Sequence, residues 1–315
     1  MKPSKAEVKG FLGQYRLSDI QRVRQFKEGW VNYNYYIQAK EGKFVLQLFG
    51  VPVTEKKLEK TRNVHKCLLH LKERNFPYKI PEPVLNKQGE RVTIKGNKGA
   101  WLYPYIEGNL KRKINNKQLE EIGSVLAQLH RLLKKEAKKE KMYPKRYEWQ
   151  MQKLNEIQTK KAHTEAQNYI KRKSKILEQA FAYLKNYNFK KNVTFCHKDI
   201  NAENMLWQRG KLVGILDFDN MRIGPRIEDI ALAISKLHLN KKEKAKQALI
   251  KGYERIQKLN KEDKTLLIPC MIKDASETVF WLYENKKIKD TELVKSAKNK
   301  MALLRALLPK GENQP

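Results

Sequence analysis

The fold is decided by the stretch Phe195-Cys196-His197-Lys198-Asp199-Ile200-Asn201-Ala202-Glu203-Asn204, which Ile215-Leu216-Asp217-Phe218-Asp219 follows shortly afterwards. The first run contains the pattern H-x-D-x-x-x-x-N. Residues 193–196 are an apolar entry to it, and residues 212–216 have the composition of a buried strand that leads to Asp217. The flanking apolar runs argue against a chance match, in which these carboxylates would only cap helices and turns of an unrelated α/β protein.

The spacing of these polar residues is typical of phosphoryl transfer. That chemistry uses one carboxylate to orient a hydroxyl nucleophile, and an asparagine and a second carboxylate to hold Mg²⁺ on the phosphates of ATP. We therefore expect Asp199 to accept a hydrogen bond from the hydroxyl of the substrate. Asn204 and Asp217 would coordinate Mg²⁺, a cation that prefers such oxygen ligands. Asp219 has two open roles, as a further metal ligand or as a cap of the following turn.

Length and composition set limits on the kind of protein. The chain has 315 residues, of which 40% are apolar, so it can form one large or two modest domains. No run approaches the roughly 20 apolar residues of a membrane span, and residues 1–6 lack the apolar stretch of a signal peptide. Cys67, Cys196 and Cys270 have neither disulfide nor metal-ligand spacing. We expect a cytoplasmic protein with free thiols and no membrane partner.

The chain is strongly basic, with 67 Lys and Arg against 34 Asp and Glu and a net charge of +33. Such a field attracts polyanions, including nucleotides and nucleic acid. Most of the excess is lysine spread along the whole sequence, whereas nucleic-acid modules more often gather arginine and aromatic residues on one face. Nucleic acid is thus a possible partner but not the favoured one.

The first third of the chain has mixed strand and helix signals. Strands are expected at residues 31–39, 44–49, 92–94 and 100–103, and a helix at residues 56–74. Residues 104–108 have the character of a crossover between two lobes.

Helices are expected to dominate beyond that crossover. An apolar stripe covers residues 119–133, with Asn115 or Asn116 as its cap. One or two helices are expected within 142–188, and further helices from 227 to 308 with breaks near residues 239–240 and 259–260.

A mixed lobe, a hinge and a helical lobe with these motifs resemble the aminoglycoside phosphotransferase and choline kinase superfamily. Residues 29–37 resemble the G-x-x-N-x-N-Y-x-V segment of that family, and residues 121–130 its G-x-x-L-A-x-L-H helix. The tail around residues 252–254 and 280–282 looks most like the homoserine kinase branch. The resemblance implies an α+β, protein-kinase-like fold, with an N-lobe at 1–103, a hinge at 104–108 and a C-lobe at 109–315.

Protein kinases share part of the pattern, but this chain departs from them. Asn201 occupies the position of their catalytic-loop lysine, and Asp219 replaces the glycine of D-F-G. The sequence contains no A-P-E signature after this segment and no G-x-G-x-x-G near Gly29. These departures favour a phosphotransferase that acts on small molecules.

The resemblance also implies a nucleotide site. Gln47 stands where the family usually has a strand lysine that holds the α- and β-phosphates, with Lys43 as a neighbour that could compensate. Glu59, or secondly Glu55, would be the helix glutamate that pairs with that lysine. The Pro104 carbonyl and the Ile106 N–H would bind adenine, with Tyr103 and Tyr105 lining the pocket.

Three further residues beside the catalytic motif have expected roles. His197 and Asp229 are expected to support the catalytic loop rather than take part in chemistry. Lys198 is either a phosphate contact or a solvated lysine.

Together these features predict an enzyme that uses ATP and Mg²⁺ to phosphorylate a hydroxyl of a small molecule: an amino acid such as homoserine, a sugar, an amino alcohol or an antibiotic. A polycationic aminoglycoside fits a chain of this charge poorly. Two alternatives stay open. Gln47 allows a weakly active pseudokinase that serves as a scaffold, and the net charge allows a polyanion-binding protein on a kinase fold.

Overall fold

The computed structural model describes the chain from residue 3 to residue 302, apart from residues 27–30, 140–145, 186–192, 238, 240–241, 285–290, 292–293, 296 and 300. Gly29, the side chains of Trp281 and Leu282, and the end of the helical tail expected to reach residue 308 lie outside the described part. The chain divides into two compact units. We call Met1–Ile114 with Ala202–Met221 the sheet unit, and Asn115–Asn201 with Arg222–Pro315 the helical unit.

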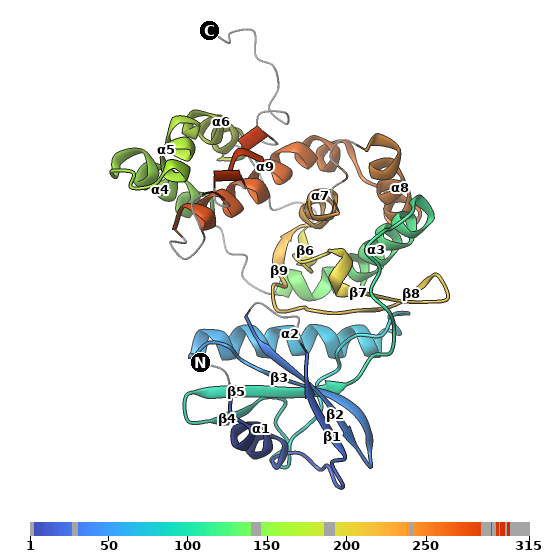
Figure 1. The fold of residues 1–315 in the computed structure, drawn as a ribbon. Coiled ribbons are helices and arrows are strands. Elements are labelled where there is room, and N and C mark those ends of the chain that lie inside the picture. Colours follow the sequence, from blue (N-terminus) through green and yellow to red (C-terminus); the bar gives the residue numbers. More distant parts are fainter. Residues whose placement is uncertain are drawn as a thin grey trace. The chain divides into compact units, whose positions relative to one another are not determined.

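The sheet unit is built on a five-stranded antiparallel sheet in the order β1-β2-β3-β5-β4 (Figure 1). The strands are β1 (Arg22–Gln25), β2 (Tyr33–Ala39), β3 (Gly42–Leu48), β4 (Thr93–Lys95) and β5 (Lys98–Pro104). The register places Gln47 of β3 opposite Asn34 of β2 and Trp101 of β5. Side chains alternate across a strand, so these three residues share one face of the sheet.

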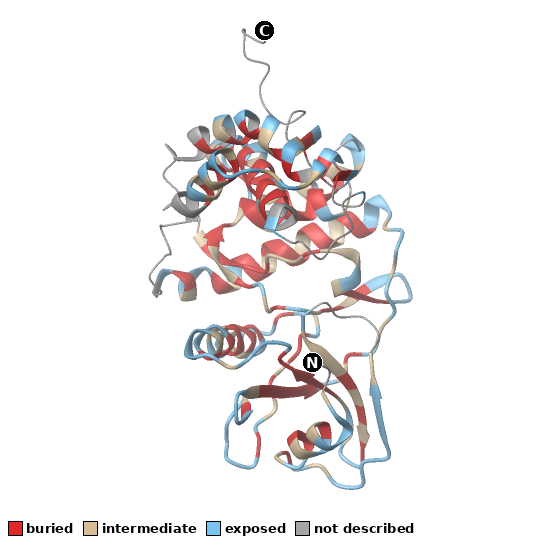
Figure 2. Cartoon of the chain, turned by 60° about the vertical axis from the view of Figure 1, so that its left-hand side comes forward, coloured by how far each residue is buried: buried red, intermediate tan, exposed pale blue. Residues whose placement is uncertain are grey.

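Helices cover both faces of this sheet. Helix α1 (Lys5–Leu12) begins with a capping box between Ser4 and Glu7, and its apolar side packs against Ile37, Leu46 and Leu102. Helix α2 (Glu55–Glu73) lies against the opposite face, where the His65 ring is 4.5 Å from the Trp101 ring. Buried residues follow the strands and the inner sides of the helices in Figure 2. The face with Gln47 and Trp101 is therefore covered by α2.

A hairpin from the second half of the sequence completes the sheet unit. After the 3₁₀ turn η1 (Ala202–Asn204), strands β7 (Met205–Gln208) and β8 (Lys211–Ile215) pair antiparallel. Backbone bonds join this hairpin to the N-terminal part of the chain, since the Lys79 N–H donates to the Val213 carbonyl at 2.9 Å and Asn109 pairs with Trp207. Asn204 and Asp217 thus belong to the same compact unit as the sheet.

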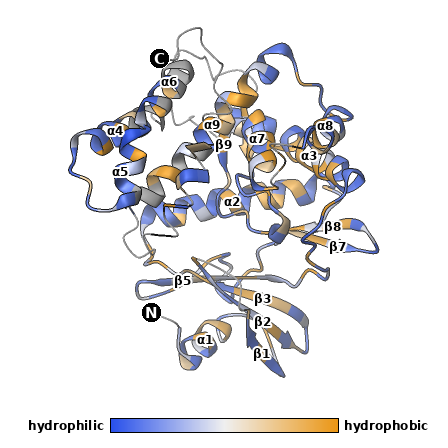
Figure 3. Ribbon diagram, turned by 45° about the horizontal axis from the view of Figure 1, so that its top comes forward, coloured by the Kyte–Doolittle hydropathy of each residue, from blue (hydrophilic) through white to orange (hydrophobic). Residues whose placement is uncertain are grey.

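The helical unit contains seven helices and one strand pair among its described residues. The helices are α3 (Asn116–Lys139), α4 (Arg146–Thr159), α5 (Glu165–Arg172), α6 (Ser174–Lys185), α7 (Ile227–Lys236), α8 (Glu243–Glu254) and α9 (Lys261–Glu284). Strand β6 (Val193–Cys196) pairs with β9 (Arg222–Pro225). The ribbons of α3 and α8 carry both hydrophilic and hydrophobic positions in Figure 3. None of the described helices has the length and apolar character that a bilayer span requires.

The predicted α+β, kinase-like fold is confirmed, with two corrections to its elements. Within 146–185, the described part of the interval 142–188, there are three helices rather than one or two, because Thr164 caps a separate helix α5 that ends at Arg172. Helix α1 and strands β1, β7 and β9 were not expected. Asn115 is the cap of α3, since its side chain accepts a bond from the Gln118 N–H at 2.9 Å. The lobe boundaries at residues 103 and 108 stay a prediction.

Candidate active site

The loop that carries Asp199 starts where β6 ends and is fixed by the first turn of α7. The Asp229 carboxylate accepts hydrogen bonds from the backbone N–H groups of His197 and Lys198, at 2.6 and 2.8 Å. Lys198 has a positive φ of 66°, a conformation that costs free energy for a residue other than glycine. The buried His197 ring accepts a bond from the Asp199 N–H at 3.2 Å through Nδ1. Together Asp229 and His197 hold the strained loop in one shape.

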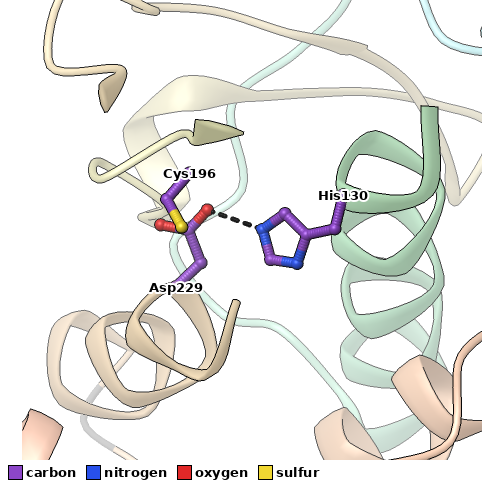
Figure 4. A group of neighbouring side chains, drawn as sticks. All are labelled: His130, Cys196 and Asp229. Carbon is purple, nitrogen blue, oxygen red and sulfur yellow. Dashed lines mark hydrogen bonds and ion pairs between the residues drawn. The ribbon is translucent and has the colours of Figure 1, made fainter. Parts of the chain in front are cut away.

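Asp229 is itself held by a buried network. His130 Nε2 lies 3.0 Å from its carboxylate, and the other ring nitrogen of His130 lies 2.9 Å from the Tyr253 hydroxyl. Figure 4 shows His130 from α3 and Asp229 from α7 joined by this contact, with Cys196 beside them. Burial raises the pKa of Asp229, but the hydrogen bond from His130 and nearby positive charges lower it more, so the net shift is downward. Asp229 is therefore a carboxylate at neutral pH.

The same three residues have ligand atoms close enough to hold a metal ion, all within 4.8 Å of one another. The donors are already used in hydrogen bonds, because the Cys196 thiol donates to the carbonyls of Gly224 and Pro225 at 3.5 and 3.4 Å. Burial also raises the pKa of the Cys196 thiol far above its usual value, so the thiolate that metals bind is disfavoured. We interpret this group as a brace for the catalytic loop.

A buried ion trio lies beside that brace. Lys198 Nζ is 2.6 Å from the Glu228 carboxylate, and Lys273 forms a second ion pair with the same carboxylate. Burial raises the pKa of Glu228, but the ammonium groups of Lys198 and Lys273 lower it more, so the net shift is downward. The solvated role expected for Lys198 is wrong, because its side chain is 8% exposed and its ammonium group pairs with a buried carboxylate. The role as a phosphate contact stays a prediction.

Asp199, the predicted catalytic residue, belongs to the helical unit. Its Oδ1 accepts a hydrogen bond from the Asn201 side chain at 2.9 Å and forms an ion pair with Lys236 at the end of α7. Its side chain is only 14% exposed. The carboxylate is thus oriented by two neighbours. Asn201 stood in the motif without an assigned role, and Lys236 has no motif signal at all.

Asn204 and Asp217, the predicted metal ligands, lie at the two open ends of the β7–β8 hairpin. The Leu216 N–H donates to the Asn204 carbonyl at 2.9 Å, which ties the two segments together. Asp217 has a positive φ of 58°. Residues with strained backbone are more frequent at functional sites, where the strained conformation orients a side chain in a direction that a relaxed turn would not allow. The backbones of the two segments thus lie side by side, and the side chains they carry, an amide and a carboxylate, are of the kind that a hard dication prefers.

Asp219 is held by the sheet unit on two sides. Asn32 donates to Asp219 Oδ2 at 2.5 Å, and Lys57 Nζ lies 3.8 Å from the same oxygen. Burial raises the pKa of the Tyr103 hydroxyl, and the nearby carboxylates of Asp219 and Asp217 raise it further. Tyr103, predicted to line the nucleotide pocket, therefore lies in the field of both acidic residues.

The predicted nucleotide residues are only partly brought together. Gln47 is buried, and its side-chain carbonyl accepts a bond from Trp101 Nε1 at 2.6 Å. Glu59 is exposed on α2, and no hydrogen bond joins it to Gln47 in the described part of the chain. Glu55, the second candidate, is bound by Arg62 at 3.2 Å. The roles predicted for Glu59 and Glu55 at the nucleotide site stay predictions.

The hinge residues adjoin a pocket of about 490 Å³ within the sheet unit. Pro104 ends β5, Ile106 is buried, and the Tyr105 N–H donates to the Lys43 carbonyl at 2.9 Å. The pocket is lined by polar, basic and aromatic side chains, among them Arg22, Arg24, Tyr36, Lys43, Tyr105 and Glu107. Lys43 Nζ pairs with Glu107 at 2.7 Å. The pocket thus lies beside the predicted hinge, and its use by a nucleotide stays a prediction.

The five-stranded sheet, the helical unit and the two motif segments define a kinase-like phosphotransferase fold. A model of the phosphotransferase enzyme family, also known as APH, matches residues 22–264. The chain therefore belongs to this family, which confirms the resemblance found in the sequence.

Among curated proteins, the chain is similar to homoserine kinases. It is 24% identical to the one from Bartonella tribocorum (strain CIP 105476 / IBS 506), over 67% of this chain and 63% of that protein. It is also 24% identical to the one from Neisseria meningitidis serogroup B (strain ATCC BAA-335 / MC58), over 82% of this chain and 81% of that protein. The chain thus spans less than two thirds of the first relative's length. These matches support the predicted small-molecule kinase.

Solved structures share the fold over nearly the full chain. An amicoumacin kinase matches with a TM-score of 0.74 and 13% identity, covering 98% of this chain and 95% of that one. A microcompartment-associated aminopropanol kinase matches with a TM-score of 0.73 and 15% identity, covering 96% and 97%. A spectinomycin phosphotransferase matches with a TM-score of 0.70 and 16% identity, covering 97% and 98%. At such identities the likeness establishes the fold alone.

Proposed function

We propose that this protein is a kinase that uses ATP and Mg²⁺ to phosphorylate a hydroxyl group of a small molecule. The observation that carries the proposal is the Asp199 carboxylate, oriented by Asn201 and Lys236 on a loop that Asp229 pins in a strained shape. Such rigid orientation of a hydrogen-bond acceptor is the main protein contribution to phosphoryl transfer, which depends on positioning and on neutralised charge.

The cofactors are argued from the donor set and from related structures. Asn204 and Asp217 offer the hard oxygen donors that Mg²⁺ prefers, and the bond from Leu216 to Asn204 keeps them on one hairpin. The spectinomycin phosphotransferase was solved with ADP, and the amicoumacin kinase with AMP-PNP and Ca²⁺. Both support the use of a nucleotide, and the amicoumacin kinase also supports the use of a divalent cation. When bound, Mg²⁺ supplies charge neutralisation at the phosphates.

The roles of the chain's own residues follow from their positions. Asp199 accepts the hydrogen bond of the substrate hydroxyl and turns its oxygen toward the phosphate that is transferred. Asn201 and Lys236 fix the orientation of the Asp199 carboxylate, while His197 and Asp229 support the loop behind it. Tyr103, Pro104 and Ile106 form the adenine side of the nucleotide site.

For the acceptor, we favour an amino acid such as homoserine or a small amino alcohol. Homoserine kinases are among the curated relatives, and an aminopropanol kinase is among the structures with the same fold. Homoserine and an aminopropanol each have a hydroxyl group and an amino group. A chain with a net charge of +33 repels polycationic sugars, so a multiply charged aminoglycoside is the less favoured acceptor.

The test is the transfer of label from γ-labelled ATP with Mg²⁺ to homoserine, amino alcohols, sugars and spectinomycin. Wild type should label one acceptor class, whereas Asp199→Asn should lose at least about a hundredfold in kcat, the order expected for a positioned acid–base group. Equal turnover by both proteins would contradict the role of Asp199. No labelled product from wild type, with any acceptor or with a metabolite extract, would contradict the proposed activity.

A pseudokinase is the second candidate, because Gln47 replaces the usual lysine and is occupied by Trp101. A neutral amide cannot neutralise phosphate charge, so this substitution weakens nucleotide binding unless another cation takes over. Titration of wild type with MgATP separates the two cases. Binding together with turnover supports the kinase, whereas the absence of both supports the pseudokinase.

A further inference from the structure

The sheet unit contains a lysine, Lys57, that can supply the positive charge that Gln47 lacks. Gln47 is neutral, buried and hydrogen-bonded to Trp101, so β3 brings no positive charge to its inner face at this position. We propose that Lys57, in the first turn of α2, is the cation that contacts the phosphates of the nucleotide. The inference rests on the proposed use of ATP and deepens it.

The position of Lys57 is set by contacts within the sheet unit. Its Nζ lies 4.7 Å from the centre of the Phe49 ring and 3.8 Å from Asp219 Oδ2. Its side chain is 19% exposed and that of Asp219 is 22% exposed. The lysine stem is therefore packed, and its ammonium group points to the acidic segment that also contains the predicted metal ligand Asp217. A charge at that place lies where the metal-bound phosphates are expected.

The ion pair with Asp219 is loose, and this leaves the ammonium group able to bind a phosphate. Direct charge-assisted hydrogen bonds measure about 2.7–2.9 Å, well below the 3.8 Å found here. Asp219 instead takes its short bond from Asn32, at 2.5 Å, and Asn32 accepts a bond from the Gly50 N–H at 3.3 Å. Asp219 is thus anchored to the sheet independently of Lys57, and it attracts the ammonium group without saturating it.

Lys57 also sits where a helix does not favour a lysine. Thr54 caps α2 by accepting a bond from the Lys57 N–H at 3.2 Å, so Lys57 lies at the positive end of the helix dipole. Anions are stabilised there and cations are not. An ammonium group added to that positive end makes a favourable place for a phosphate. Local helix preference therefore does not favour this lysine, which is held there by the Asp219 carboxylate and would be stabilised further by a bound phosphate.

Lys43, the other lysine considered as a substitute, is less suited. Its ammonium group is bound by Glu107 at 2.7 Å, and its side chain is 50% exposed. A pair of this kind is already neutralised and is screened by solvent. The structure thus distinguishes the two lysines, one engaged at the hinge and one available beside Asp219.

Binding of adenosine, AMP, ADP and ATP in the presence of Mg²⁺, measured by calorimetry, tests the inference without an acceptor. Lys57→Met should weaken MgATP binding roughly tenfold to a hundredfold, the range for losing a hydrogen bond between charged groups. The loss should grow with the number of phosphates and vanish for adenosine. Lys57→Arg should keep most of the affinity. Lys56→Met is the matched control, since Lys56 is an exposed neighbour on the same helix turn and should bind as wild type does.

A double variant adds a gain of function. Gln47→Lys in the Lys57→Met background returns a lysine to β3 and should recover part of the MgATP affinity. Thermal unfolding of each variant checks that the fold is intact. Lys57→Met binding within twofold of wild type would overturn the inference while the proposed function stands. If wild type binds adenosine but gains nothing from added phosphates, the inference and the proposed use of ATP both fail.

Discussion

Glu228 is a buried residue whose ion pairs stabilise the catalytic loop. Its carboxylate is 4% exposed and forms ion pairs with the ammonium groups of Lys198 and Lys273. Glu228→Gln would remove the carboxylate with which both buried ammonium groups pair, so we expect a loss of about 3–5 kcal/mol in the free energy of unfolding. Urea denaturation measures it, with Glu59→Gln, an exposed substitution, as the control. Equal midpoints for the two variants would contradict the role of the ion trio.

The same carboxylates make stability depend on acid pH. The pKa values of Glu228 and Asp229 are lowered in the folded protein from ordinary values of 4.5 and 3.8. Groups with lowered pKa values stabilise the fold fully above their unfolded pKa, and the contribution is lost as the pH falls toward the folded pKa. We therefore expect these groups to give a flat profile from pH 8 to pH 6 and a decline below about pH 4.5. Urea midpoints measured from pH 8 down to pH 3.5 test this expectation. A midpoint at pH 3.5 equal to that at pH 7 would contradict it.

Helix pairs in the helical unit depend on close approach at glycine. A Cβ atom on Gly252 of α8 would lie 1.8 Å from the Glu120 carbonyl oxygen of α3, and one on Gly123 would lie 2.0 Å from the Leu249 carbonyl oxygen. Gly252→Ala must therefore push the two helices apart, at a cost of about 1–3 kcal/mol or more. Gly13→Ala is the control, because its φ is −60° and its nearest new contact is 3.5 Å. Thermal unfolding should show a lower melting temperature for Gly252→Ala and an unchanged one for Gly13→Ala.

Elements with regular patterns could be predicted from the sequence, and those without them could not. The apolar stripe of α3 has a clear helical period, and Asn115 marks the start of the helix. The paired strands β2 and β3 are rich in aromatic and aliphatic residues. Strand β1 is almost wholly exposed, so it lacks the alternation that marks a half-buried strand. Helix α1 is only eight residues long, too short for a strong period, although its Ser4–Glu7 capping box was visible.

Candidate site residues show the same division. The H-x-D-x-x-x-x-N pattern pointed to Asp199, Asn204 and Asp217, because fixed spacing along one loop is written in the chain. Lys57 and Lys236 were not found, since contacts across the fold leave no local spacing. A lysine in a chain with 67 Lys and Arg residues gives no signal by its identity. Only the distances to Asp219 and Asp199 single these two out.

The residues proposed to bind MgATP and the residue proposed to orient the substrate hydroxyl belong to different compact units of the chain. Asn204, Asp217 and Lys57 belong to the sheet unit, whereas Asp199 belongs to the helical unit. MgATP at a hundred times its Kd should stabilise the binding-competent protein by about 2.7 kcal/mol. We expect Asp199→Asn to keep this gain in thermal unfolding while it loses turnover.

Asp217→Asn serves as the matched comparison, because it is the same substitution at a predicted metal ligand. It should lose both turnover and the Mg²⁺-dependent part of the stabilisation, since a neutral amide binds a dication less well than a carboxylate. If Asp199→Asn abolished nucleotide stabilisation as fully as Asp217→Asn, the two residues would act on the same step. The division between nucleotide binding and hydroxyl positioning would then be wrong, and Asp199 would have to contribute to the nucleotide site itself.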